Sequence, residues 1–100
     1  MEKLVMLAKI FSDANRVKII ALIHREKELC VCEICDTLKL SQPLVSRHLK
    51  QMRDNDVVQT HQSGKWIIYS LHKNETIDCL LKTIEADIAT LPTIISCATR

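Results

Sequence analysis

The sequence predicts a single domain, residues 1–100, that is mainly α-helical and carries one β-hairpin. Apolar side chains recur at helical spacing over residues 4–52 and again over 77–91. Residues 57–71 instead form two β-branched or aromatic runs on either side of the only glycine. One glycine and two prolines in 100 residues indicate long regular elements and few loops. So short a chain buries a limited fraction of its surface, which favours a partner subunit.

Two helices are predicted at the start of the chain. The apolar stripe of the first is Leu4, Leu7, Ala8 and Phe11. Ser12 or Asp13 can cap the second helix, because both side chains accept hydrogen bonds from a first-turn N–H. The core positions of this second helix are Val17, Ile20, Ala21 and Ile23. We expect it to end near the charged residues 26–28.

Two further helices follow, joined by a tight connection at residues 39–41. Ile34, Cys35 and Leu38 mark a short third helix of about two turns. Ser41 caps the fourth, and Pro43 lies in its first turn, where its missing N–H costs nothing. The predicted buried positions of the fourth helix are Val45, Leu49 and Met52.

The C-terminal part is predicted to contain the hairpin and one long helix. Strands at 57–60 and 65–71 are separated by a turn at 61–64. Asn74 can cap a helix that continues to Leu91, and Pro92 ends it because the residue before a proline avoids helical backbone angles. We expect residues 93–100 to be loosely packed.

A short helix, a tight turn and a capped amphipathic helix form a helix-turn-helix pattern, and the hairpin makes it a winged one. Five of the 14 Lys and Arg residues lie between Leu38 and Trp66, but only two of the 12 Asp and Glu residues. This concentration suits a surface that faces phosphates, although a polar helix face can also be merely solvated. His48 adjoins the buried stripe, so a structural role is equally open to it. The candidate DNA-binding residues are Ser41, Gln42, Ser46, Arg47, His48, Lys50, Gln51 and, in the wing, Lys65.

Three of the five cysteines fall within six residues, at Cys30, Cys32 and Cys35. Thiolates select soft, thiophilic metals and metalloids, and a thiol near a helix N-terminus is acidified. Cys32 and Cys35 can share one helix face, whereas Cys30 can join them only where the backbone is extended or the helix unwinds. Binding through all three thiolates should therefore distort the start of the third helix.

Other interpretations of the cysteines stay open. They can pack as small hydrophobic residues. The motif from Cys32 to Cys35 is also a C-x-x-C redox motif, so the same fold could be a thiol-redox sensor. A thiol oxidoreductase is less favoured, because the expected β-α-β context is missing. Structural zinc would need a fourth ligand that is absent nearby in sequence. The roles of Cys79 and Cys97 stay open.

Three segments together resemble the ArsR family of metalloregulatory repressors, and within it the arsenic-responsive repressors. They are Leu29–Cys35, Ser41–Leu49 and Gly64–Tyr69, and Ser12–Arg16 is similar to the opening of that family's second helix. The resemblance covers roughly residues 12–71. The zinc-sensing branch uses Asp and His residues on the last helix, and residues 74–91 contain no histidine.

The resemblance implies a non-enzymatic repressor that binds operator double-stranded DNA as a homodimer and releases it when As(III) or Sb(III) binds Cys30, Cys32 and Cys35. It implies no organic cofactor. A dimer built on the first and last helices would use Leu4, Leu7, Phe11, Leu80, Ile84 and Ile88. With no apolar run of membrane-spanning length and no secretory signal, we expect a cytoplasmic protein with no membrane partner.

Overall fold

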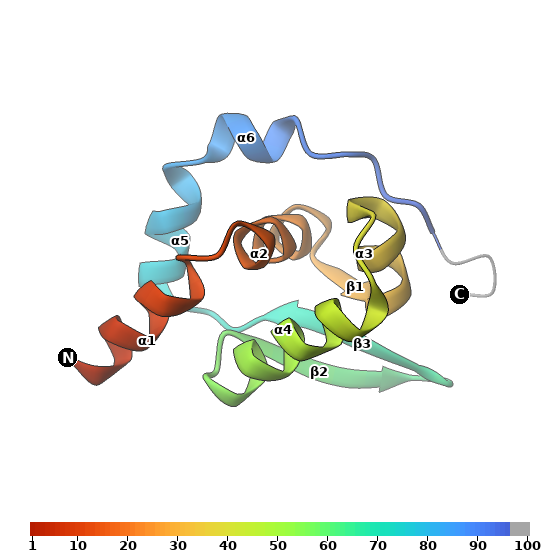
Figure 1. Cartoon of the computed structure of the whole chain (residues 1–100), viewed down its shortest axis with the longest axis horizontal. Coiled ribbons are helices and arrows are strands. Elements are labelled where there is room, and N and C mark those ends of the chain that lie inside the picture. Colours follow the sequence, from red (N-terminus) through yellow and green to blue (C-terminus); the bar gives the residue numbers. More distant parts are fainter. Residues whose placement is uncertain (97–100) are drawn as a thin grey trace.

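The structure is a computed structural model, which describes residues 1–96 and has the predicted winged helix-turn-helix architecture (Figure 1). No helix among these residues is long and apolar enough to cross a membrane. The helices are α1 (Glu2–Ile10), α2 (Ala14–Glu26), α3 (Val31–Leu38), α4 (Gln42–Asp54), α5 (Glu75–Lys82) and α6 (Glu85–Ala89). The strands are β1 (Glu28–Cys30), β2 (Val58–Ser63) and β3 (Trp66–Leu71).

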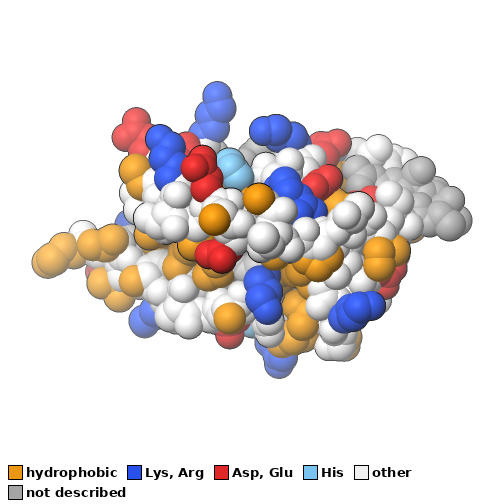
Figure 2. All heavy atoms as spheres, turned by 90° about the horizontal axis from the view of Figure 1, so that it is seen from above, with side chains coloured by type: hydrophobic (Ala, Val, Ile, Leu, Met, Phe, Trp, Pro, Cys, Tyr) orange, Lys and Arg blue, Asp and Glu red, His pale blue; other side chains and the backbone are white. Residues whose placement is uncertain are grey.

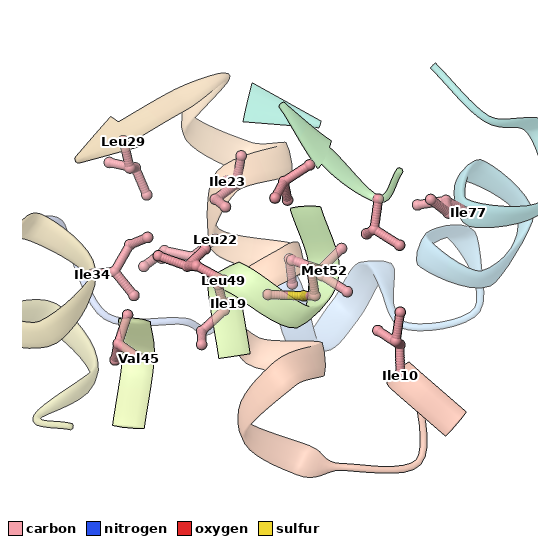
Figure 3. Packing of buried hydrophobic residues seen from close by; sticks show 14 of the residues in the cluster. Ile10, Ile19, Leu22, Ile23, Leu29, Ile34, Val45, Leu49, Met52 and Ile77 are labelled. Carbon is pink, nitrogen blue, oxygen red and sulfur yellow. The ribbon is translucent and has the colours of Figure 1, made fainter. Parts of the chain in front are cut away.

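Helix α2 lies at the centre of the molecule, with α6 across one side and α3, α4 and the sheet on the others (Figure 1). Five consecutive residues, from Ile19 to Ile23, are buried, which is more than one face of a helix can supply. This explains why the sequence shows a broad apolar run here instead of a narrow stripe. Leu22 and Ile23 belong to the same core cluster as Leu29 and Leu49, which Figure 3 shows.

The sheet has three strands, in the order β1-β3-β2 with both pairs antiparallel. The prediction of a hairpin alone was therefore incomplete, because the three-residue strand β1 is too short to show an alternating pattern. It pairs Cys30 with Ile68 on the central strand. Strand β2 also continues through residues predicted as a turn, and the reversal falls at Gly64, whose φ of 63° suits glycine.

Helices α3 and α4 form the helix-turn-helix unit. Lys39 ends α3 in the left-handed conformation, with φ 57° and its N–H bonded to the Cys35 carbonyl. Ser41 then caps α4, and its hydroxyl accepts from the Leu44 N–H at 3.4 Å. The three predicted core positions of α4, Val45, Leu49 and Met52, are each fully buried.

Helix α1 buries a different face from the one predicted. Leu7 and Ile10 enter the core, whereas Leu4 is 63% exposed and Val5 53% exposed. Figure 2, seen from the side that carries α6, shows hydrophobic side chains gathered on the projecting N-terminal end, while positive and negative side chains are mixed over the rest of that face. The outer side of α1 thus offers apolar surface that residues 1–96 leave exposed.

The predicted long last helix is instead two helices at an angle (Figure 1). Thr83 donates its hydroxyl to the Leu80 carbonyl at 2.6 Å, and Ile84 has φ −120°, outside the helical range. The bend lets Ile88 bury against the core, together with Ile77 and Leu81 from α5. Helix propensity alone could not predict the bend, because the packing of α6 on α2 offsets the loss of helical hydrogen bonds at the bend.

The segment after α6 is also more ordered than predicted, over the residues that the structure describes. Arg25 of α2 donates to the carbonyls of Leu91 and Pro92 at 2.9 and 2.6 Å. The Ile95 N–H donates to the Thr37 hydroxyl of α3 at 2.9 Å. Residues 91–96 are therefore tied to both α2 and α3.

Candidate nucleic-acid interface and cysteine cluster

The outward face of α4 carries most of the predicted DNA-binding side chains. Of these, Lys50 donates to Asp54 Oδ2 at 3.0 Å along the helix. Arg47 has no ion pair within residues 1–96, so its guanidinium is available to an anion. At α4 and its cap, the exposed members of the predicted set are Ser41, Gln42, Ser46, Arg47 and Lys50.

His48 does not lie on that exposed face, and a DNA contact by its side chain stays a prediction. It is 7% exposed and points toward the start of α2, where its Nδ1 lies 3.4 Å from Arg16 Nη1. Its Nε2 lies 4.0 Å from Asp13 Oδ1. The imidazole thus helps to join α4 to α2, which is the structural role left open by its place beside the buried stripe.

Arg16 organises this contact, a role that was not predicted from the sequence. Its Nε and Nη2 donate to the carbonyls of Ile10 and Lys9 at the end of α1, each at 3.0 Å. Its Nη1 donates to Gln51 Oε1 of α4 at 3.2 Å. Gln51 is consequently only half-exposed and serves first as a partner for Arg16. One side chain therefore links α1, α2 and α4.

The pKa values of both ionisable partners of Arg16, His48 and Asp13, are lowered, but for different reasons. Burial lowers the pKa of His48, and the Asp13 carboxylate only partly offsets this effect. The pKa of Asp13 is also lowered, chiefly because its carboxylate accepts from the Arg16 N–H at 3.1 Å as the cap of α2. At neutral pH the pair is thus an ionised aspartate facing a neutral imidazole.

The wing presents Lys65 at its tip. Lys65 is exposed, and its Nζ lies 5.7 Å from the centre of the Trp66 ring, within cation–π range. Gln62 donates to the Gly64 carbonyl at 3.1 Å and so braces the turn. This arrangement keeps one positive charge at the end of the hairpin.

The three clustered cysteines occupy three different settings at the start of α3. Cys30, at the end of β1, is 1% exposed and packs with Ile68. Cys32 is half-buried, with its Sγ 3.5 Å from Asp36 Oδ2. Cys35 belongs to the main core. Within residues 1–96, no three Cys, His, Asp or Glu side chains are gathered closely enough to hold a metal ion.

The thiol chemistry differs between these positions. Cys32 is disulfide-bonded, whereas Cys30, Cys35 and Cys79 are not. Neither Cys30 nor Cys35 is therefore the partner of Cys32 in that bond. Burial raises the pKa of Cys35, and the adjacent Asp36 carboxylate adds to the rise. The predicted acidification is therefore wrong for this thiol. Cys79 is exposed on α5, and Cys97 lies outside the described residues.

A capping box surrounds Cys30 and was also missed. The Cys30 N–H donates to Glu33 Oε1 at 3.1 Å, and the Cys30 side chain accepts from the Glu33 N–H. Glu33 is 5% exposed, which is rare for a carboxylate. The spacing of a small polar residue and a glutamate three positions later was visible in the sequence, but cysteine is not the usual residue at the cap.

The six residues predicted for a dimer interface are in unequal positions. Leu4 is exposed, and Phe11, Leu80 and Ile84 are half-buried. Leu7 and Ile88 are buried in the chain's own core at 5% and 8% exposure, so they have little surface left for a second copy, and the interface stays a prediction. Of the six, Leu4 on α1 is the most exposed, at 63%.

Comparison with known proteins agrees with this geometry. Residues 13–60 match the model of bacterial regulatory proteins of the arsR family. The chain is 41% identical over 78 residues to the arsenic resistance transcriptional regulator ArsR1 of Pseudomonas putida, which covers 76% of this chain and 61% of that protein. It is 41% identical over 61 residues to the cadmium resistance transcriptional regulatory protein CadC of Listeria innocua, which covers 61% of this chain and 51% of CadC.

A solved structure extends the comparison to the whole fold. The chain superposes on the transcriptional repressor PagR of Bacillus anthracis with a TM-score of 0.73 and 32% identity, over 83% of this chain and 93% of PagR. The chain spans between half and two thirds of the length of the two curated relatives named above.

Proposed function

Because this chain belongs to the ArsR family of bacterial regulatory proteins, we propose that it is a transcriptional repressor that trivalent arsenic or antimony releases from operator DNA. The observation that carries this proposal is the position of the cysteine cluster. Cys30, Cys32 and Cys35 bracket the first turn of α3, and α3 packs directly against the DNA-facing helix α4. A ligand that bridges these sulfurs acts on the support of the DNA-reading helix.

DNA recognition in this proposal uses α4 in the major groove and the wing beside it. Gln42 at the start of α4 can pair with adenine, and Arg47 can donate to guanine or to a phosphate. Ser41 and Ser46 can donate to phosphates, and Lys65 at the wing tip can contact the backbone or the minor groove. Two copies related by a two-fold axis would read half-sites one helical turn, or a multiple, apart.

Homodimerisation supplies that two-fold axis in the proposal. Leu4 and Val5 are large apolar residues left exposed on α1, which is unusual for a surface that stays in water. The half-buried Leu80 of α5 and Phe11 offer further apolar area to a second copy. A small domain gains core in this way that it cannot form alone.

The donor set fits the inducer, but the geometry requires a rearrangement. Three thiols exchange with arsenous acid, As(OH)₃ + 3 RSH → As(SR)₃ + 3 H₂O, with no change in oxidation state. Within residues 1–96 the three cysteines are not gathered closely enough to hold one ion, so at least one sulfur has to move before all three can reach one atom. Movement of Cys30 pulls on the first turn of α3, and α4 then loses its placement.

Operator release under arsenite tests the proposal. Fluorescence anisotropy of a labelled operator is followed while arsenite is added, with a phosphine reductant because Cys32 must be reduced and dithiols chelate arsenite. We expect release by the wild type and none by C30S, C32S or C35S. C79S is the matched control, since Cys79 is exposed on α5, and it should respond as the wild type does. Continued release by the three cluster variants contradicts the site.

Two alternatives predict different outcomes in the same assay. CadC is named for cadmium resistance, so release by Cd²⁺ at lower concentration than by arsenite would make a divalent soft metal the inducer. A thiol-redox regulator would release DNA with peroxide alone. The disulfide of Cys32 is the observation that supports this alternative, but the bond joins Cys32 to neither Cys30 nor Cys35.

A further inference from the structure

A buried glutamate lies directly between the cysteines of the cluster. Glu33 follows Cys32 in α3, and its side chain turns back to the helix start, where Oε1 accepts from the Cys30 N–H at 3.1 Å. In return, the Cys30 side chain accepts from the Glu33 N–H. Both halves of a capping box are thus present, with a thiol in the position that serine or threonine usually fills.

The capping box holds Cys30 from one side while the sheet holds it from the other. Cys30 has extended backbone angles, φ −92° and ψ 165°, and pairs with Ile68 of β3. Its sulfur is buried in a small cluster with Ile68, against which Cys32 and Trp66 pack. Cys35 is in the other cluster, with the residues of the main core. The ligand-free arrangement is therefore one in which the sulfur of Cys30 has a structural role of its own.

We propose that Glu33 is a positioning residue that sets the threshold of arsenite response, because its capping box with Cys30 must open before the three sulfurs can meet. This inference rests on the proposed function. Once its sulfur is bonded to arsenic, Cys30 can no longer act as the cap of α3 in the same geometry. The free energy needed to open the capping box then reduces the net free energy of arsenite binding. In the same way, a ligand that selects a sparsely populated conformation binds more weakly overall.

The direction of the effect distinguishes this role from a merely structural one. A residue that only stabilised the fold, or that helped to hold the ligand, would leave arsenite binding unchanged or weaker when it was removed. Removing the capping carboxylate should instead tighten arsenite binding, because the ligand-free state loses a contact that the bound state does not have. Since a helix cap contributes a factor of roughly 3 to 10 to an equilibrium, E33A should lower the arsenite Kd by about that factor.

Trp66 provides the measurement. It is the only tryptophan of the chain and packs against the cluster that contains Cys30, so its fluorescence reports on displacement of that sulfur. Arsenite is titrated into DNA-free, phosphine-reduced wild type, E33A, E33D and E33Q. Asp keeps the negative charge of the first turn but is too short to reach the Cys30 N–H, so E33D should also bind more tightly and covers the case in which E33A does not fold. Gln keeps the accepting oxygen, so E33Q should bind as the wild type does.

A second cap far from the cysteines provides the control for lost stability. Asn74 caps α5 by accepting from the Ile77 N–H at 3.1 Å. N74A should destabilise the fold to a similar extent and leave the arsenite Kd unchanged. Equal or weaker binding by E33A and E33D, with wild type binding normally, overturns the role of Glu33. Absence of arsenite binding to the wild type overturns the proposed function itself, whatever the Glu33 variants do.

Discussion

The side chain of Arg16 gives the sharpest stability prediction, because four contacts from one guanidinium join three helices. In R16A, the carbonyls of Lys9 and Ile10 lose their donor, as does Gln51 Oε1, and His48 loses its neighbour at 3.4 Å. A hydrogen bond from a charged donor contributes about 1.5–3 kcal/mol when buried. Water can replace the donor at the exposed Lys9 carbonyl, so the four contacts together should contribute only about 2–3 kcal/mol.

Urea denaturation followed by circular dichroism measures this loss as a lower midpoint with an unchanged slope. A double-mutant cycle with Q51A isolates the contact between α2 and α4. Since Arg16 Nη1 and Gln51 Oε1 are 3.2 Å apart, we expect a coupling on the order of 0.5–1.5 kcal/mol. K18A, which changes an exposed lysine of the same helix, is the matched control and should shift stability by less than about 0.5 kcal/mol. Additivity of R16A and Q51A within about 0.3 kcal/mol would refute the linking role.

Three further predictions concern stability. Because folding lowers the pKa of His48, the unfolded chain binds the proton more tightly than the folded chain does. The stability that neutral His48 contributes should be fully present above pH 6.5 and be lost as the pH falls through the folded pKa. Urea midpoints measured from pH 7.5 to 5 should therefore decline, and H48Q should reduce that decline. L49A, at a fully buried position of α4, should lower the unfolding free energy by about 2–5 kcal/mol in the same denaturation assay. A loss below about 1 kcal/mol would mean that the core collapses around the gap. G64A should cost about 1–2 kcal/mol of unfolding free energy through backbone strain alone, since φ is 63° and no atom lies within 4 Å of an added Cβ; G64N, which tolerates that conformation better, should cost less.

Much of this fold follows from local chemistry that the sequence displays. Ser41 and Asn74 cap helices as predicted, each accepting from the N–H three residues later. The core positions of α4 follow from their spacing, and the hairpin follows from its β-branched residues and Gly64. Each of these features depends on neighbours within about four residues, so the sequence displays the cause directly.

The tertiary structure decided the features that depend on distant partners. Strand β1 exists because β3 pairs with it, and the last helix bends because α6 can pack on α2. Arg16 reaches Gln51 of α4 across 35 residues of sequence, and its own neighbours in the chain give no sign of this role. His48 illustrates the same limit, because a position beside the buried stripe could face either DNA or the protein until Asp13 and Arg16 were placed next to it.

The cysteine cluster combines both kinds of information. From the sequence alone, the spacing showed that Cys30 lies before a regular helix containing Cys32 and Cys35, and that binding through all three would disturb its first turn. The tertiary structure added that Cys30 is buried against β3 and closes a capping box with Glu33. Spacing determines which side chains can share a helix face, whereas the free energy needed to move one of them depends on what packs around it, and only the folded chain supplies those neighbours.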